Sequence, residues 1–432
     1  MAVIIGTPFK SLANASAKAR GLPGIAAVAL PQPVLTGETQ DFRPCVDDAI
    51  DEIIFALTKW QSPQSKTAKA DTSFVFEGAD YEEALGNMND GFMARRMGDG
   101  FPLVPPTKER VEWMLSGTNL DPEEVVASYE NLYHPITVRI IAINAVMAGA
   151  RPEYMPVIIA ALKAISRTRQ PHFLFGSAGM FAPVIMLNGP IAKEIGVNYG
   201  VGLMGPGFRA NATIGRAVNL IFTNGVGQVP GDQGFSGHSM PGRYSWCFAE
   251  NEEASPWEPF HVDQGFPADA NVVSVVSARG SQTLMVESPA SNVAAAIAHA
   301  VSGCTVGIYS MAYCQLVVLG PSHAKMLASE GWKKKDIQRY VYENARIPKW
   351  KAESMGLRLK EPEKWQTVTS DETMVSMLRG PEHLVVKVAG IPGTHFSTFI
   401  PGIDRIAVED IEKYKPKAWD RLLQAGRARA QF

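Results

Sequence analysis

Cysteine, net charge and long apolar runs are all scarce in this sequence of 432 residues. Its four cysteines are too few for a disulfide framework and lack metal-knuckle spacing, so we expect reduced thiols in a cytoplasmic protein. Lys and Arg total 41 against 43 for Asp and Glu, which argues against a nucleic-acid-binding surface. No apolar segment approaches the ~20 residues of a membrane span, and the start does not resemble a secretion signal. We therefore expect neither a nucleic acid nor a membrane as partner.

The composition provides ample material for a core, because 46% of the residues are hydrophobic and 19% are charged. We expect an α/β protein in three parts. A small α/β unit covers 1–60, a polar linker covers 61–75, and one large mixed α/β (α+β) domain with a catalytic or substrate-binding role covers 76–432.

The first sixty residues have a β-α-β-α pattern that is too small to fold independently. Apolar segments around residues 3–5 and 25–30 predict strands, and helical spacing of apolar residues follows each. Two parallel strands need neighbours on their edges and cover on both faces. We therefore expect this half-domain to complete its sheet with the rest of the chain or with another chain.

The large region has helical and strand-like segments without an evident internal sequence repeat. Helices are expected over 81–96, 108–115, 136–147, 153–166, 211–223, 291–301, 322–330 and 335–345. Strands are expected over 182–187, 270–278, 282–287, 315–319 and 384–389. The two strands at 270–278 and 282–287 are expected to pair with each other.

A glycine-rich turn before the strongest helix is a candidate anion-binding site. Gly205 and Gly207 would allow a ligand close to the backbone, Asn211 and the free N–H groups of the helix would donate hydrogen bonds, and Arg209 and Arg216 would add positive charge. The alternative is a tight turn with an asparagine cap and two surface arginines. The sequence leaves both open.

The aromatic loop 238–263 contains the candidate catalytic residues. Cys247 could be a nucleophile, Glu250 a proton carrier and His261 its titrating partner. The alternative is a small buried cysteine beside a solvated acidic surface. A metal site with His238 matches no known ligand spacing, so no metal is predicted, and the sequence identifies no cofactor.

Two further polar residues are candidate substrate contacts. Asp99 lies between two glycines and could be a binding carboxylate or a turn former. Asn144 lies inside an otherwise apolar helix, where it could face a pocket or tie two helices together.

Several stretches resemble the UGSC-type (seleno)protein family. Thr7-Pro-Phe9 between two strands is similar to the closing part of the UGSC domain, and the larger region resembles that domain's uncharacterised companion. The stretches that carry the second resemblance are Gly98–Pro106, Asn144–Gly149, Arg209–Arg216 and Cys247–Glu253.

The family's redox motif, selenocysteine or cysteine followed by Gly-Ser-Cys, does not occur in this chain. The resemblance therefore implies a separate small subunit that carries the motif, docks on residues 1–60 and forms a hetero-oligomeric enzyme, an oxidoreductase or a lyase. The family's redox motif further implies thiol or selenol chemistry at a carbon–sulfur or carbon–heteroatom bond. The turn at 205–211 with Arg209 predicts that the substrate is a small, anionic molecule. Two alternatives remain: a self-contained lyase or hydratase that works by acid–base catalysis, and a non-catalytic scaffold for a catalytic partner.

Overall fold

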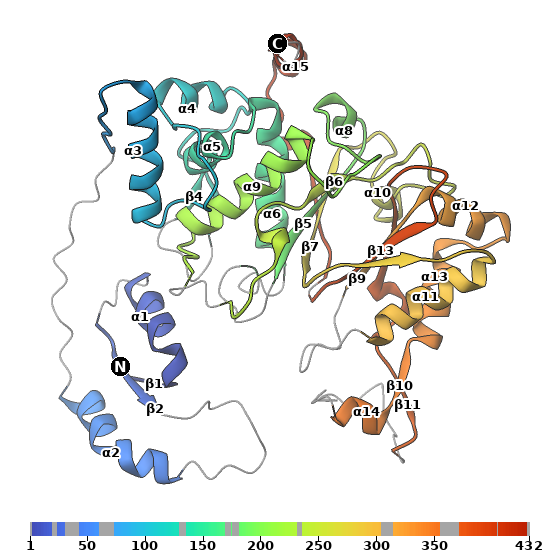
Figure 1. Cartoon of the computed structure of the whole chain (residues 1–432), viewed down its shortest axis with the longest axis horizontal. Helices are drawn as coiled ribbons and strands as arrows, with labels where there is room; N and C mark the ends of the chain where they lie inside the picture. The colour runs from blue at the N-terminus through green and yellow to red at the C-terminus, as the bar shows by residue number, and fades with distance from the viewer. Residues whose placement is uncertain are drawn as a thin grey trace.

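The structure is a computed structural model of a mixed α/β protein (Figure 1). It describes residues 2–19, 24–30, 43–59, 73–128, 135–168, 174, 181–230, 236–303, 314–354, 371–403 and 405–429. Most of the expected linker 61–75 lies outside these residues. Within the described part of the chain, no helix is long and apolar enough to cross a membrane.

The N-terminal unit has the expected β-α-β-α order. Its elements are β1 (Ala2–Gly6), η1 (Thr7–Phe9), α1 (Lys10–Ala19), β2 (Ala26–Leu30) and α2 (Arg43–Thr58). The two strands pair in parallel, with Ile4 opposite Val28. The buried core of this unit is small and consists of Ala26, Val28, Ile53 and Ala56, so α2 packs on the face of the sheet that carries Val28.

A layer of helices with two short strands lies beside the main sheets. Its elements are α3 (Tyr81–Ala94), α4 (Lys108–Leu115), β3 (Val125–Ala127), β4 (Ile136–Thr137), α5 (Val138–Met147), η2 (Pro152–Tyr154), α6 (Met155–Ser166), α8 (Ile191–Glu194) and α9 (Arg209–Asn224). The Thr107 hydroxyl caps α4 as expected, by accepting a hydrogen bond from the Arg110 amide. The helix expected from residue 136 begins later, because Ile136 and Thr137 pair with β3, and Thr137 then caps α5.

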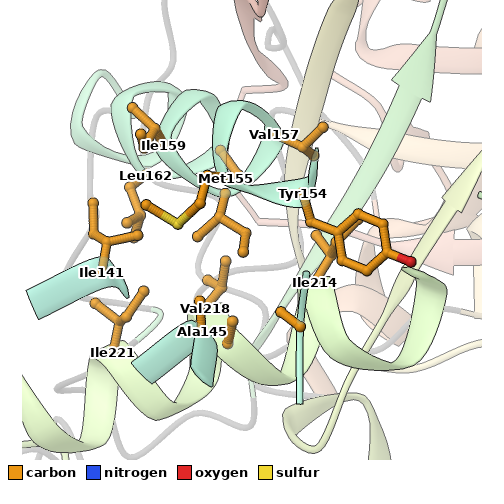
Figure 2. Close-up of a cluster of buried hydrophobic side chains, with 14 of the residues drawn as sticks. Ile141, Ala145, Tyr154, Met155, Val157, Ile159, Leu162, Ile214, Val218 and Ile221 are labelled. Carbon is orange, nitrogen blue, oxygen red and sulfur yellow. The ribbon is translucent and has the colours of Figure 1, made fainter. Parts of the chain in front are cut away.

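Three of these helices form the largest core of the molecule. Figure 2 shows Ile141 and Ala145 of α5, Met155 of α6, and Val218 and Ile221 of α9 pointing toward one another. All five side chains are buried, in keeping with the nearly uniform apolar character of α5 and α6.

Two four-stranded sheets lie next to this layer. The first has the order β14-β7-β5-β6 and the second β12-β9-β13-β8. In chain order the strands are β5 (Ala182–Asn188), β6 (Cys247–Ala249), β7 (Val272–Ala278), β8 (Gln282–Met285), β9 (Gln315–Leu319), β12 (Leu384–Val388), β13 (Phe396–Pro401) and β14 (Ala407–Asp410).

The strands β5, β6, β7, β9 and β12 are buried on both faces, and alternate side chains along a strand pack into different cores. In β5, Ile185 packs against the α5–α6–α9 helices while Met186 faces the other sheet. In β9, Leu316 faces β5's sheet while Val317 packs against a second helical layer. The main body therefore has four layers, helices–sheet–sheet–helices, as Figure 1 shows from α6 to α11.

The second helical layer and the remaining short elements complete the body. They are η3 (Pro241–Arg243), α10 (Phe260–Asp263), α11 (Ala290–Gly303), α12 (Pro321–Ser329), α13 (Lys334–Asn344), β10 (Arg346–Pro348), α14 (Lys349–Ser354), β11 (Met374–Ser376), η5 (Pro381–His383), η6 (Glu412–Tyr414) and α15 (Trp419–Arg429). Helices α11 and α13 pack on each other, and α11, α12 and α13 contact the strands of the second sheet.

The two sheets repeat one topology. In the first half of the body (182–285), β5 pairs in parallel with β6 and antiparallel with β7. In the second half (315–410), β9 pairs in parallel with β12 and antiparallel with β13. A helix precedes the first strand of each half, α6 before β5 and α11 before β9, and helices connect its two parallel strands.

The fourth strand of each half is exchanged. Strand β8 pairs with β13 of the second half, and β14 pairs with β7 of the first half. The prediction that the strands at 270–278 and 282–287 pair with each other is therefore wrong. Their short connection looks like a hairpin, but the chain instead crosses to the other sheet.

Two segments of the chain cross from one sheet to the other: the one between β7 and β8, and the one between β13 and β14. These crossing segments contact each other where β7 and β13 end. The Arg279 amide donates to the Pro401 carbonyl at 2.9 Å, and the Ile403 amide donates to the Ser277 carbonyl at 3.1 Å. Gly402 lies at this crossing, and a Cβ there would come within 2.7 Å of the Cys314 carbonyl oxygen. A glycine is thus required for the close approach of the two chain segments.

Candidate active site

The carboxyl ends of β5, β6 and β12 meet between the two sheets. The Asn251 amide, just after β6, donates to the Val388 carbonyl at 2.7 Å, and the Asn251 side chain donates to the Gly390 carbonyl at 2.9 Å. This junction joins the parallel strand pair of the first half to that of the second half. Ligand sites in α/β proteins commonly lie at such strand ends.

Lys387 is the cation at this junction and has no exposed side-chain surface. It is the charged residue of the otherwise apolar strand Leu384–Val388, and its side chain points toward the first sheet. Its Nζ lies 2.8 Å from Asn188 Oδ1 and 2.9 Å from Ser274 Oγ, and 4.2 Å from the centre of the Phe260 ring. Glu250 Oε2 is 3.9 Å away, which is too far for a hydrogen bond.

Burial lowers the pKa of Lys387 to about 8, although the Glu250 carboxylate opposes this shift. An ammonium group has three N–H donors, and the two hydrogen-bonding oxygens leave one without a partner. The neutral amine needs fewer acceptors, so the surroundings favour the uncharged form more than water does. Lys387 can therefore gain and lose a proton near neutral pH.

Glu250 is buried beside Lys387 and is held by three N–H donors. Its Oε2 accepts from Asn188 Nδ2 at 2.7 Å and from the Phe260 amide at 3.1 Å, and its Oε1 accepts from the Val388 amide at 3.4 Å. Both oxygens of this buried carboxyl group therefore accept at least one hydrogen bond. The carboxylate is thus positioned to stabilise a positive charge on Lys387.

Asn188 connects Glu250 to a second carboxylate, Glu252. Its Nδ2 also donates to Glu252 Oε1 at 2.8 Å, and the Gly189 amide donates to the same oxygen at 2.8 Å. The Glu252 side chain is 25% exposed, whereas Glu250 and Lys387 are fully buried. Glu252 therefore connects the buried hydrogen-bond network to solvent.

His261 extends the network beyond Glu252. Its Nε2 lies 3.2 Å from the Ala268 carbonyl oxygen, which indicates that this nitrogen carries the proton in the neutral ring. Its Nδ1 is buried without a hydrogen-bond partner among the described residues and lies 3.6 Å from Glu252 Oε1. The unpartnered Nδ1 thus lies next to Glu252, at a distance too long for a direct hydrogen bond.

The structure thus brings together two of the three candidate catalytic residues, Glu250 and His261, but the third has different surroundings. Cys247 lies in β6 with its side chain among the helices on the other face of the sheet. Burial raises the pKa of its thiol far above the usual range. A nucleophilic cysteine needs an accessible thiolate, so we correct this expectation and leave Cys247 out of the chemistry.

The candidate anion-binding residues do not converge on one point. Arg216 and Asp99 form a bidentate ion pair, with Nε–Oδ2 and Nη2–Oδ1 distances of 2.7 and 2.9 Å. Each thus neutralises the other, and Arg216 also donates to the Phe101 and Pro102 carbonyls. Their geometry is that of a tie between α9 and the loop before α4 rather than of an open anion site.

The glycine-rich turn keeps part of its predicted character. Gly205, Gly207 and Arg209 are exposed, and no side chain caps the N-terminus of α9. Asn211 is not a cap, because it is buried and exchanges hydrogen bonds with the backbone of Asn198. Anion binding by Arg209 stays a prediction.

Asn144 has the structural role that the sequence left open. Its Nδ2 donates to the Ile140 carbonyl at 2.9 Å, and its Oδ1 accepts from Asn224 Nδ2 at 2.6 Å. It therefore ties α5 to the end of α9. Among the described residues, no group of three or more His, Cys, Asp or Glu side chains is arranged to hold a metal ion.

Sequence reasoning missed Lys387, Asn188 and Ser274. A signal was present for Lys387, because a charged residue within a strand of apolar neighbours is buried on one face and needs partners. Asn188 ends a fully buried strand just before a Gly-Pro turn, which is where α/β proteins present polar side chains. Ser274 has no comparable signal.

We compared the chain with models of protein families, with curated proteins and with solved structures, and none matches it.

Proposed function

We propose that this protein is an acid–base enzyme of the lyase or hydratase type, with its active site at the Lys387–Glu250 junction. The observation that carries the proposal is the fully buried Lys387, whose pKa is lowered to about 8. A buried titrating group with a defined charged partner is typical of catalytic sites.

In the proposed step, the neutral Lys387 amine removes a proton from a carbon next to a substrate carbonyl or carboxylate group. The C–H electron pair stays with the substrate, and the resulting ammonium is stabilised by the Glu250 carboxylate, 3.9 Å away. In the reverse direction the ammonium returns the proton. Because neither side chain is exposed, the substrate must be small and the sheet ends must part to admit it.

Hydrogen–deuterium exchange of candidate substrates tests this proposal without knowledge of the full reaction. The intact protein is incubated in D₂O with a panel of 2-hydroxy, 3-hydroxy and α,β-unsaturated carboxylic acids, and loss of C–H signals is followed by NMR. We expect exchange on at least one of them, with a pH midpoint near 8. Lys387→Met should lower the exchange rate by about 10²–10⁴-fold.

A matched control separates catalysis from packing. Lys334 is also largely buried, and its Nζ is 2.7 Å from Asp263 Oδ2 and 2.6 Å from the Glu258 carbonyl oxygen. Lys334 makes no hydrogen bond to Lys387 or Glu250, but its charge helps to lower the pKa of Lys387. Lys334→Met should therefore move the pH midpoint of exchange upward and leave the rate above that midpoint within a few-fold of the wild-type rate. Equal exchange by wild type and Lys387→Met would contradict the proposal.

A second candidate function keeps the thiol or selenol chemistry that the family resemblance implies. Cys247 is buried, so this chemistry would not use the Cys247 thiol. The resemblance to the UGSC-type family suggests a small subunit with a Cys/Sec-Gly-Ser-Cys motif docked on the N-terminal unit. Arg209 would then contribute to the binding of an anionic substrate.

Co-purification from native cells tests the second candidate. The tagged full-length chain is isolated, and the proteins that accompany it are identified by mass spectrometry and tested for the motif. A stoichiometric small subunit with the motif is the expected result. A fully active homo-oligomer, purified without any other chain, contradicts this candidate but leaves the acid–base proposal intact.

A further inference from the structure

Among the described residues, the N-terminal unit has no strand at the position to which its second helix would lead. Figure 1 shows α1 and α2 on opposite sides of the β1–β2 pair. Connections between parallel strands are right-handed. Since α1 lies on one face and leads from β1 to β2, a helix on the other face leads to a strand at the opposite edge, beside β1. The sheet has only two strands among the described residues, so this position is empty there.

Neither strand has features that protect an open edge. The strand sequences, Ala2–Gly6 and Ala26–Leu30, contain no charged residue and no proline. Monomeric proteins normally protect an exposed edge with charges, prolines or bulges, because its unpaired N–H and C=O groups pair readily with another strand. On β1, Ile4 lies on the same face as the buried Val28 and is nevertheless 52% exposed.

Helix α2 has an apolar stripe beyond the one that packs on the sheet. Ile50, Ile54 and Leu57 are three or four residues apart, so they lie on one side of the helix. They are 43%, 50% and 64% exposed. Leaving this much large apolar surface in water costs free energy, and contiguous exposed apolar surface of this kind marks an interaction site.

The charges beside this stripe favour a basic partner. Asp47 lies one turn before Ile50, and Asp51 lies one turn before Ile54. Both carboxylates are exposed and form no ion pair with the described residues. A second copy of this chain docked on the same surface would bring identical carboxylates together, which is unfavourable. A different chain with Lys or Arg residues around an apolar strand is complementary.

We propose that the N-terminal unit is a docking site for a different protein chain that adds a β-strand beside β1 and sets basic side chains against Asp47 and Asp51. The added strand would cover Ile4, and other apolar side chains of the partner would cover the stripe on α2. The proposal rests on the second candidate function only for the existence of a partner, and it does not depend on the partner's chemistry.

Site-specific photo-crosslinking in native cells tests this docking mode with the full-length chain. A photoreactive benzoylphenylalanine is placed at position 54, and a control at position 81, where Tyr81 is 66% exposed on α3. Cross-linked peptides are identified by mass spectrometry. We expect position 54, and not position 81, to cross-link to a strand-forming, Lys- or Arg-containing peptide of another chain.

Charge reversal supplies the matched comparison. Asp47→Lys together with Asp51→Lys should lower the cross-link yield by about tenfold or more. Glu82→Lys together with Asp90→Lys reverses the charge of two exposed acidic residues on α3 and should leave the cross-link yield unchanged. Circular dichroism checks that both double variants fold.

The outcomes separate the proposals. Three results would each overturn the docking proposal. The first is a cross-link from position 54 to this same chain or to a second copy, the second is no cross-link, and the third is an equal cross-link yield after the α2 charge reversal. A cross-linked basic strand from a chain without a thiol motif supports the docking proposal and removes only the thiol function.

Discussion

The two halves of the main body have the same topology but contribute unequally to the junction between them. In the first half, the parallel strands end in Asn188 and run into Glu250 and Glu252. In the second half, the corresponding strand ends are apolar or glycine, at Gly320 and at 388–390. Among the described residues that hydrogen-bond at the junction, the second half contributes one polar side chain, Lys387, from within a strand, together with backbone groups of Val388 and Gly390. A repeated scaffold therefore supports an asymmetric polar cluster.

This difference shows how the fold assembles a buried polar site. The asparagine is the last residue of β5 and the carboxylates lie just after β6, where the neighbouring backbone can adjust to supply N–H donors. The lysine lies on a rigid strand of the other sheet, so its position relative to Glu250 depends on how the sheets pack. The exchanged strands β8 and β14 fix that packing, because each half completes the sheet of the other.

The largest effect should come from breaking the buried pair on its acidic side. Glu250→Leu leaves Lys387 without its counter-charge and frees three N–H donors, and we expect a loss of about 3–5 kcal/mol in the free energy of unfolding. Lys387→Met should cost less, because Glu250 keeps its three donors. Urea unfolding of both variants measures this asymmetry, and equal losses would contradict it.

A pH dependence of stability should arise from Lys387. In the unfolded chain this lysine keeps its proton up to about pH 10.5, whereas in the folded protein it loses the proton near pH 8. The unfolded state binds more protons in this window, so the free energy of unfolding rises with pH, by about 3 kcal/mol in all. Below pH 8 both states are protonated and this contribution is constant.

The quantity measured is the free energy of unfolding of the wild type minus that of Lys387→Met. This subtraction removes the contributions that the other titrating groups make equally to both proteins. Urea unfolding at several values between pH 7 and pH 10.5 gives the two curves. The wild type should gain stability relative to the variant only above pH 8. A constant difference would mean that Lys387 keeps its proton in the folded protein.

The strand exchange should be sensitive to one glycine. A Cβ on Gly402 would lie 2.7 Å from a backbone oxygen and from Val276 Cγ1, so Gly402→Ala should destabilise the protein by about 1–3 kcal/mol. Gly280, in the other crossing segment, has nothing within 4 Å of its Cβ position, and Gly280→Ala should be neutral or slightly stabilising. Thermal unfolding of the pair compares them, and equal effects would argue against a tight crossing.

The sequence predicted the local elements well and the pairing of strands poorly. Strands with uniform apolar character, such as Gln315–Leu319, and helices with clear caps, such as Lys108–Leu115, follow from local patterns and were found as expected. Strand β8 pairs with β13, which lies more than a hundred residues away in the chain, and no local pattern encodes this pairing. The topological repeat was hidden for the same reason, because it lies in the strand order rather than in the residues.

The candidate site was predictable in part. The sequence singles out Glu250 and His261 because they lie in one aromatic, acidic loop, where sequence neighbours are also neighbours in space. Lys387 and Asn188 are 199 positions apart and become neighbours only when the two sheets pack. Asp99 and Arg216 were predicted as separate ligands of an anion, but opposite charges that meet in a fold satisfy each other.

The smallest effect should be that of modifying Cys247, which lies in the first half but points away from the junction. Its side chain belongs to the core beneath α9, and burial keeps the thiol protonated. Iodoacetamide should therefore leave Cys247 unmodified in the folded protein and modify it after unfolding in urea, as peptide mass spectrometry can measure. Cys45, which is partly exposed, is the internal control for reagent activity.

Cys247→Ala removes a buried sulfur at a cost of about 1 kcal/mol in the free energy of unfolding and should leave the deuterium-exchange activity unchanged. Rapid alkylation in the native state, with loss of that activity, would return Cys247 to the mechanism and shift the chemistry from the junction to the opposite face of β6.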